Sequence, residues 1–178
     1  MKRVLLHVCC GICSAWAVEK LQNDGFQVSG FFYNPNIQPE EEYRKRLIAA
    51  QKVFELLKIE LLVGDYLPGR WLEKVKGLED ELEGGKRCLV CFRSRLEEAK
   101  RKADELAIEH FTSTLSISPH KDFQVIREIG SSLSPAGFLA YDFKKENGFK
   151  KSSLFSREHQ IYRQNYCGCL YSMIKAKT

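Results

Sequence analysis

The fold of this chain is decided near its amino terminus, where residues 4–14 read VLLHVCCGICS. The apolar run over residues 4–8 is typical of a buried strand. Ser14 can cap a helix that continues to about Asn23. The three cysteines therefore lie between a strand and a helix, at the carboxyl end of the strand. Open parallel sheets bind their ligands at that edge.

The rest of the chain alternates between strand and helix patterns, which favours a parallel sheet. Further strands are expected over residues 26–33, 60–63, 110–114 and 137–142. Helices are expected from residue 39 onward and over residues 70–76, 88–106, 122–133 and 156–165. The sequence thus predicts an α/β fold with an open, mostly parallel sheet, helices on both faces and a basic helical C-terminal segment. We expect residues 1–178 to form a single domain, since most domains hold about 100–200 residues.

The composition excludes several classes of protein. Hydrophobic residues make up 44% of the chain and charged residues 29%, which argues against a disordered tail, a collagen-like fibre or a coiled-coil rod. No apolar run approaches the ~20 residues that cross a bilayer. The apolar stretch near the amino terminus is too short for a signal peptide. We therefore expect a cytoplasmic protein without a membrane partner.

The positive charge is concentrated at the carboxyl end. The chain carries a net charge of +5, of which residues 144–178 supply +6 and residues 1–143 supply −1. This asymmetry suggests an anionic partner, with nucleic acid first in line, although a solvated basic tail is the alternative. The candidate RNA-binding residues are Lys144, Lys145, Lys150, Lys151, Arg157 and Arg163.

Seven cysteines fall into three tight groups, around residues 9–13, 88–91 and 167–169. Their odd number argues against a secreted disulfide scaffold, and clustered thiols in a reducing compartment indicate metal binding or redox catalysis. Four of them supply the number of thiolates that a [4Fe–4S] cluster or an all-cysteine zinc site requires: Cys9, Cys10, Cys88 and Cys91. Spacing alone does not choose between iron and zinc, but the position at a strand end favours an active cluster.

Cys167 and Cys169 are separated by one glycine, so a disulfide between them would close a small and strained ring. Such a pair is suited to cycling between dithiol and disulfide, although two further metal ligands or inert thiols are the alternative. Tyr141 and Asp142 form a polar group after the last expected strand and are candidate proton donors. His7 lies inside the first strand, where we expect a satisfied core histidine.

Five segments, in order along the chain, resemble one known family. They are LLHVCCGICS (5–14), RCLVCFR (87–93), FTSTLS (111–116) with Ser118-Pro119, DFKK (142–145) and YRQNYCGCLYS (162–172). Together they resemble the cobalamin-independent epoxyqueuosine reductases of the QueH type over essentially the whole chain. The double cysteine and the Tyr-Cys-Gly-Cys sequence are the specific parts.

This resemblance implies an adenine-nucleotide-hydrolase-like fold and a cobalamin-free reductase. The reaction it implies is the two-electron removal of the epoxide oxygen from epoxyqueuosine in tRNA, the last step of queuosine biosynthesis, with an electron donor that the sequence does not identify. It assigns Cys9, Cys10, Cys88 and Cys91 to a [4Fe–4S] cluster and Cys167 with Cys169 to a redox-active pair. Cys13 is left over, either as a candidate ligand to an additional mononuclear iron or as a thiol that only neighbours the ligands.

Three other functions compete with this interpretation. A non-catalytic four-cysteine zinc module that binds tRNA or a protein would explain four cysteines but leave Cys167 and Cys169 idle. A thioltransferase-like oxidoreductase would use Cys88 and Cys91 directly and ignore RNA. A tRNA thiolation enzyme of related fold is disfavoured, because the sequence lacks the phosphate-binding motif that such enzymes use for ATP.

Overall fold

The computed structural model describes residues 1–176, so the last two residues of the predicted basic segment, Lys177 and Thr178, lie outside it. Four strands form one sheet: β1 (Lys2–Val8), β2 (Phe26–Phe32), β3 (Leu61–Val63) and β4 (His110–Ser113). Their order is β3-β2-β1-β4 and every pairing is parallel. The predicted open parallel sheet is confirmed.

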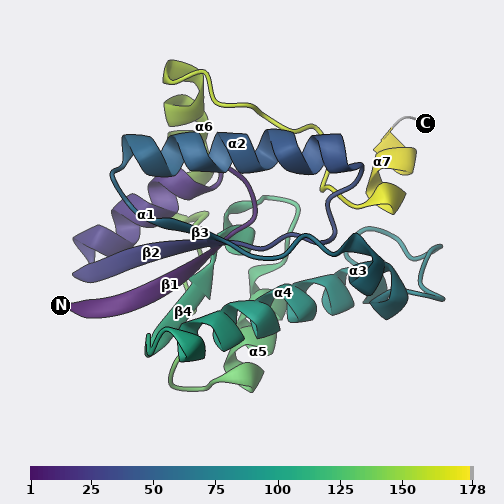
Figure 1. Cartoon of the computed structure of the whole chain (residues 1–178), viewed down its shortest axis with the longest axis horizontal. Coiled ribbons are helices and arrows are strands. Elements are labelled where there is room, and N and C mark those ends of the chain that lie inside the picture. The colour runs from purple at the N-terminus through teal and green to yellow at the C-terminus, as the bar shows by residue number, and fades with distance from the viewer. Residues whose placement is uncertain (177–178) are drawn as a thin grey trace.

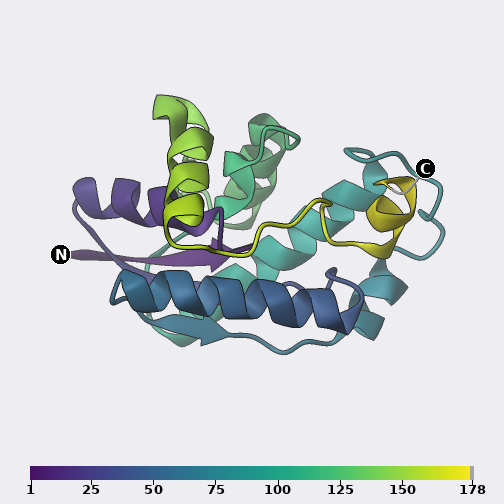
Figure 2. The ribbon, with the colours of Figure 1, turned by 90° about the horizontal axis from the view of Figure 1, so that it is seen from above.

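Helices cover both faces of this sheet, as predicted (Figure 1). The upper layer in that view holds α1 (Ser14–Asn23), α2 (Glu40–Leu56) and α6 (Gly148–Glu158), and the lower layer holds α4 (Lys86–Glu105) and α5 (Phe123–Leu133). The shorter helices are α3 (Pro68–Lys74), α7 (Leu170–Ala176) and the 3₁₀ turns η1 (Thr114–Ile117) and η2 (Lys145–Asn147). Both views place α7 beside the start of α4 (Figures 1 and 2). None of the helices over residues 1–176 combines the length and apolar character that a bilayer crossing needs.

The central strand β1 supplies both halves of the hydrophobic core. Val4, Leu6 and Val8 pack into the layer of α1 and α2, whereas Leu5 packs with Phe31 into the layer of α4 and α5. All five side chains are fully buried. Each contributes roughly 1.5–3 kcal/mol of transfer free energy, which is why a single apolar run fixes the centre of the sheet.

His7 is the one polar side chain within β1's buried stretch, and its ring is fully satisfied. Nδ1 lies 2.8 Å from Ser113 Oγ and Nε2 lies 3.0 Å from the carbonyl oxygen of Tyr33. Burial, assisted by the positive charge of Arg95, lowers the pKa of His7 to about 3. The histidine is therefore neutral and structural, as the sequence predicts.

Two expected elements differ from the structure. Residues 137–142 do not form a strand: Phe138 makes one isolated bridge with Phe111, and the chain then turns as the Tyr141 amide donates to the Leu139 carbonyl. In place of the helix expected over residues 156–165, the structure has α6, which spans Gly148–Glu158. It begins after Asn147, whose φ is +60°, and the chain leaves the helix before Gln160, whose φ is +52°.

Candidate active site

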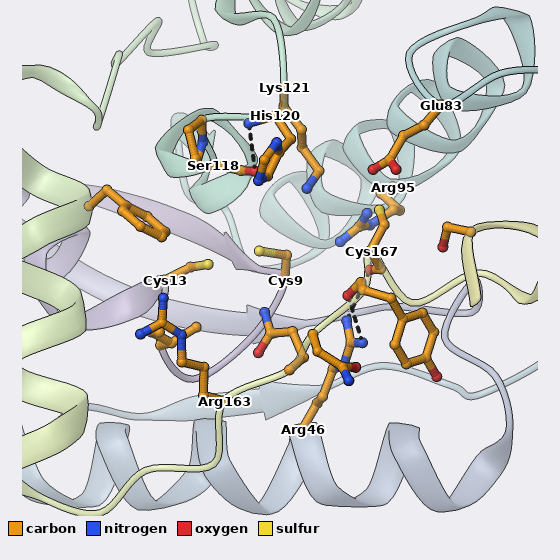
Figure 3. Close-up of a pocket in the computed structure, with 17 residues that line it drawn as sticks. Cys9, Cys13, Arg46, Glu83, Arg95, Ser118, His120, Lys121, Arg163 and Cys167 are labelled. Carbon is orange, nitrogen blue, oxygen red and sulfur yellow. Dashed lines mark hydrogen bonds between the residues drawn. The ribbon is translucent and has the colours of Figure 1, made fainter. Parts of the chain in front are cut away.

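A cavity of about 430 Å³ opens beyond the carboxyl end of β1, and its lining includes three cysteines, Cys9, Cys13 and Cys167 (Figure 3). A smaller cavity of about 40 Å³ adjoins it and is lined by Cys88 and again by Cys167. The two cavities share further lining residues: Glu83, His120 and Lys121. Cysteines from all three sequence groups therefore meet around two neighbouring cavities.

The first set of cysteines, the β1 thiol group, consists of Cys9, Cys10 and Cys13, whose sulfur atoms all lie within 4.8 Å of one another. The sulfur atoms of Cys9 and Cys10 are 3.6 Å apart. A turn at Gly11 brings them together. A Cβ at Gly11 would lie 2.7 Å from the carbonyl carbon of Ala49 in α2, so this close approach requires glycine.

Thr114, which the sequence did not single out, holds Cys9 in place. Its hydroxyl oxygen accepts from the Cys9 amide at 3.0 Å and its hydroxyl donates to the Cys9 sulfur at 3.2 Å. The contact arises because β4 ends beside β1, so the residue after each strand reaches the same edge. A hydroxyl residue directly after a neighbouring strand is the signal that could have identified it.

The three thiols of the β1 thiol group differ in acidity. Hydrogen bonds from the Cys10 and Cys13 thiols, assisted by the cations of Lys121 and Arg95, hold the pKa of Cys9 well below its ordinary value. Burial raises the pKa of Cys10 to about 12. The pKa of Cys13 is also raised, because its thiol donates to its two neighbours and is buried. Cys9 is thus the most acidic of the three thiols, and the other two act as its donors.

The second set, the α4 thiol group, consists of Cys88, Cys91, Cys167 and Cys169. Cys88 and Cys91 occupy the first turns of α4, and Cys91 packs with Cys169 and Trp71 in a small apolar cluster. Burial raises the pKa of Cys88 above its ordinary value and that of Cys91 to about 11. In contrast to Cys9, these two thiols stay protonated near neutral pH unless a metal displaces the protons.

A buried ion pair fixes the segment that carries Cys167 and Cys169. Arg46 of α2 pairs with Glu42 at 2.7 Å and donates to the carbonyl oxygens of Cys167 at 2.9 Å and Tyr166 at 3.0 Å. Gly168 lies between the two cysteines with a φ of +123°, a conformation that favours glycine. The sequence did not indicate this anchor, because Arg46 is about 120 residues away from the segment it holds.

The structure does not place the four predicted cluster ligands at the spacing of a single ion. Thiolates on one tetrahedral metal ion lie about 3.8 Å apart, since each is about 2.3 Å from the metal. Cys13 joins Cys9 and Cys10 within 4.8 Å of one another, whereas Cys88 and Cys91 lie outside that group. A [4Fe–4S] cluster binds its four cysteines through four separate irons and so spans a wider set of sulfur atoms.

Tyr141 and Asp142, the predicted proton donors, are not among the residues that line either cavity. The Tyr141 hydroxyl donates to Asp24 at 2.7 Å, beyond the carboxyl end of α1, while the thiols lie before its amino end. Asp142 instead lies 3.5 Å from the Lys144 ammonium group. The geometry therefore gives no support to a proton-donor role for either residue.

Of the six predicted RNA-binding residues, Arg163 lines the larger cavity. Lys144 is used inside the protein, where its ammonium group donates to the carbonyl oxygens of Ser116 and Lys121. Lys151 lies over the Trp16 ring at 3.6 Å. The remaining three are absent from the lining of both cavities: Lys145, Lys150 and Arg157. Sequence reasoning missed the cavity-lining charges Glu83, Arg95 and Lys121.

Comparisons with known proteins identify the family. The model of the family described as epoxyqueuosine reductase QueH matches residues 4–175. Proteins described as epoxyqueuosine reductase QueH from Streptococcus pyogenes serotype M1 and Helicobacter pylori are each 39% identical, over 95% and 96% of this chain. A protein of the same description from Thermotoga maritima is 35% identical over 99% of this chain. The chain spans 69%, 49% and 93% of these relatives, respectively.

Two solved structures share the fold at low sequence identity. A U34-tRNA thiolase NcsA from Methanococcus maripaludis, described with its [4Fe–4S] cluster, has a TM-score of 0.58 at 14% identity, covering 99% of this chain and 63% of the thiolase. A predicted tRNA methyltransferase subunit from Methanocaldococcus jannaschii also has a TM-score of 0.58, at 15% identity, covering 86% and 75%. Both likenesses show that this chain shares its α/β fold with these two structures. By its family match and its relatives, the chain belongs to the QueH epoxyqueuosine reductases, oxidoreductases of queuosine biosynthesis.

Proposed function

We propose that this reductase works with a [4Fe–4S] cluster held by Cys9, Cys10, Cys88 and Cys91. The donor set fits such a group, because all seven cysteines are free and members of all three sequence groups line two adjoining cavities, namely Cys9, Cys13, Cys88 and Cys167. Buried polar atoms without partners lie in the same region, namely Trp71 Nε1, Arg95 Nε and Gln164 Oε1. When bound, the cluster supplies single-electron transfer and Lewis acidity.

A further part of the proposal concerns Cys13, which would ligate an additional mononuclear iron. Its sulfur atom lies within 4.8 Å of those of Cys9 and Cys10, so an ion bound by Cys13 would share these two thiolates with the cluster. Soft thiolates suit iron, but they suit zinc as well. Metal analysis therefore decides the identity of the ion, and cobalamin is not part of the proposal.

Cys167 and Cys169 would supply the reducing equivalents. Removal of an epoxide oxygen as water, leaving an alkene, consumes two electrons and two protons. Oxidation of two thiols to one disulfide releases the same two electrons and two protons, so the step balances. Arg46 holds the backbone of this pair at the wall of the cavity. An external electron donor would then restore the dithiol.

The tRNA substrate would place its modified base in the larger cavity. Lys121 enters the cavity from one side and Arg163 from the other, so both cations can meet the phosphates that flank the base (Figure 3). Gln164 and Asn165 line the same cavity and offer amide groups to the base edge, and Phe149 offers a ring for stacking. His120 and Lys121 are the cavity residues that would move protons in place of the predicted pair.

One observation carries this proposal: a single cavity is lined by three cysteines and two cations, namely Cys9, Cys13, Cys167, Lys121 and Arg163. The test is an assay of anaerobically reconstituted protein on tRNA that carries epoxyqueuosine, with iron, sulfide and zinc quantified in the same sample. We expect queuosine to form in proportion to cluster content. Zinc in a colourless protein without turnover would instead support the four-cysteine zinc module.

A further inference from the structure

Three arginines are fully buried near the thiols, and two of them have conventional partners. Arg46 pairs with the carboxylate of Glu42. Arg87 donates to three backbone carbonyl oxygens at 2.7–3.0 Å and lies over the ring of Tyr171 at 4.9 Å. Their charges are compensated by groups that the fold itself provides, so both arginines have a structural explanation.

Arg95, like Arg87, forms no ion pair with a carboxylate within residues 1–176, but unlike Arg87 its side chain donates to no backbone carbonyl oxygen there. Its side chain donates to Asn34 Oδ1 at 2.6 Å and to the sulfur of Cys91 at 4.0 Å, while Nε has no partner. The residue is 2% exposed. A buried charge is costly unless an anion compensates it, and the groups that favour this charge are the thiols of Cys91, Cys9 and Cys167. Lys121 opposes it as a like charge, and Glu83 lines the same cavity without an ion pair to it.

The position of Arg95 is fixed and central. Asn34, which accepts from the guanidinium group, donates in turn to the carbonyl oxygen of Val8 at 2.9 Å, so Arg95 is tied to the end of β1. In Figure 3 the guanidinium group lies between Cys9 and Cys167. A permanent positive charge therefore stands where the β1 thiol group meets the α4 thiol group.

We propose that Arg95 is a positioning residue that favours the reduced state of the thiolate-held redox centre. The inference rests on the proposed function, since it requires that Cys9 and Cys91 ligate the cluster. Adding an electron makes such a centre more negative, and a fixed cation with N–H groups aimed at its sulfur ligands stabilises that state. Trp71 acts in the same direction but more weakly, because its buried indole N–H lies in the cluster that holds Cys91 but carries no charge.

The experiment measures the midpoint potential of the reconstituted cluster in the full chain, by visible and electron paramagnetic resonance spectroscopy, with iron and sulfide quantified. Arg95→Met should lower the reduction equilibrium constant about tenfold or more, a shift of about 59 mV per tenfold for one electron. Arg95→Lys keeps the charge and should lower it less. Trp71→Phe should shift it a few-fold in the same direction. The matched control is Arg93→Met, on the same helix but at an exposed position.

The metal content and the midpoint potential of the Arg95 variants together test the inference. An Arg95→Met protein with full iron and sulfide and an unchanged potential would overturn the inference. Loss of iron from both Arg95 variants would also overturn it, because a residue that tunes the centre is not required for assembly. If the unaltered protein binds no iron–sulfur cluster, the proposed function fails first, a result that iron analysis separates from an unchanged potential.

Discussion

The two thiol groups of this protein are built in opposite ways. The β1 thiol group comes from five consecutive residues, and a single glycine turn against α2 is enough to gather its sulfur atoms. The α4 thiol group joins the first turns of a helix to a C-terminal segment about 80 residues later, and it depends on α2 for its anchor. One group is local and the other is tertiary.

This difference extends to their chemistry. The pKa of Cys9 in the local group is lowered by its neighbouring thiols, whereas burial raises the pKa values of Cys88 and Cys91. Substitutions that disturb the tertiary group should therefore change metal content, dithiol chemistry and stability to different degrees.

The largest effect is expected for Cys88→Ala, which removes one proposed cluster ligand from the tertiary group. The brown chromophore and the turnover of epoxyqueuosine should disappear together. Visible absorption, iron content and product formation measure both. Leu89→Ala, at the exposed neighbouring position on α4, is the control and should retain colour and activity. Full activity in a cluster-free Cys88→Ala protein would contradict the scheme.

A smaller but still large effect is expected for Arg46→Met. Glu42 would be left buried without its partner, so the free energy of unfolding should fall by about 3–5 kcal/mol. Activity should fall about 100-fold, because Cys167 loses the contact that positions its backbone. Chemical denaturation and steady-state kinetics give the two quantities.

The double variant Arg46→Met/Glu42→Gln separates these two roles. Removing the unpaired carboxylate should restore much of the lost stability, while activity stays low because the carbonyl oxygens of Tyr166 and Cys167 still lack their donor. Recovery of activity along with stability would show that Arg46 serves the fold alone.

A moderate effect is expected for Arg163→Gln, at the rim of the larger cavity. If Arg163 contacts a phosphate, tRNA affinity should weaken and the slope of log affinity against log salt should fall by about 1. Lys150→Gln, outside the cavity lining, should change both quantities less. Equal effects in the two variants would mean that the basic segment binds RNA diffusely rather than at the cavity.

The smallest effect is expected for Tyr141→Phe. This change removes one hydrogen bond to the partly exposed carboxylate of Asp24, so the free energy of unfolding should change by about 1 kcal/mol or less. Turnover should stay the same, since Tyr141 does not line the cavity. A tenfold loss of turnover with intact metal content would restore the predicted proton-donor role.

The sequence predicted the local features well and the long-range contacts poorly. Strand β1, its turn and the neutral state of His7 follow from hydrophobic pattern and spacing within a few residues. The positions of α6 and of Tyr141 do not follow from local patterns. The irregular chain after Gln160 is held by a hydrogen bond from Arg46, which is distant in sequence. The Tyr141 hydroxyl donates to Asp24, which is equally distant. Arg95 and Thr114 also escaped notice, since only the tertiary fold brings them to Cys9.

The most direct test of the central claim compares iron and acid-labile sulfide in the anaerobically reconstituted protein and in a Cys88→Ala/Cys91→Ala variant. If both thiol groups serve one cluster, the unaltered chain should hold iron and sulfide in the ratio of [4Fe–4S], and the variant should lose the sulfide while keeping at most the iron bound near Cys13. An undiminished sulfide content in the variant would show that the α4 thiol group takes no part in binding the cluster.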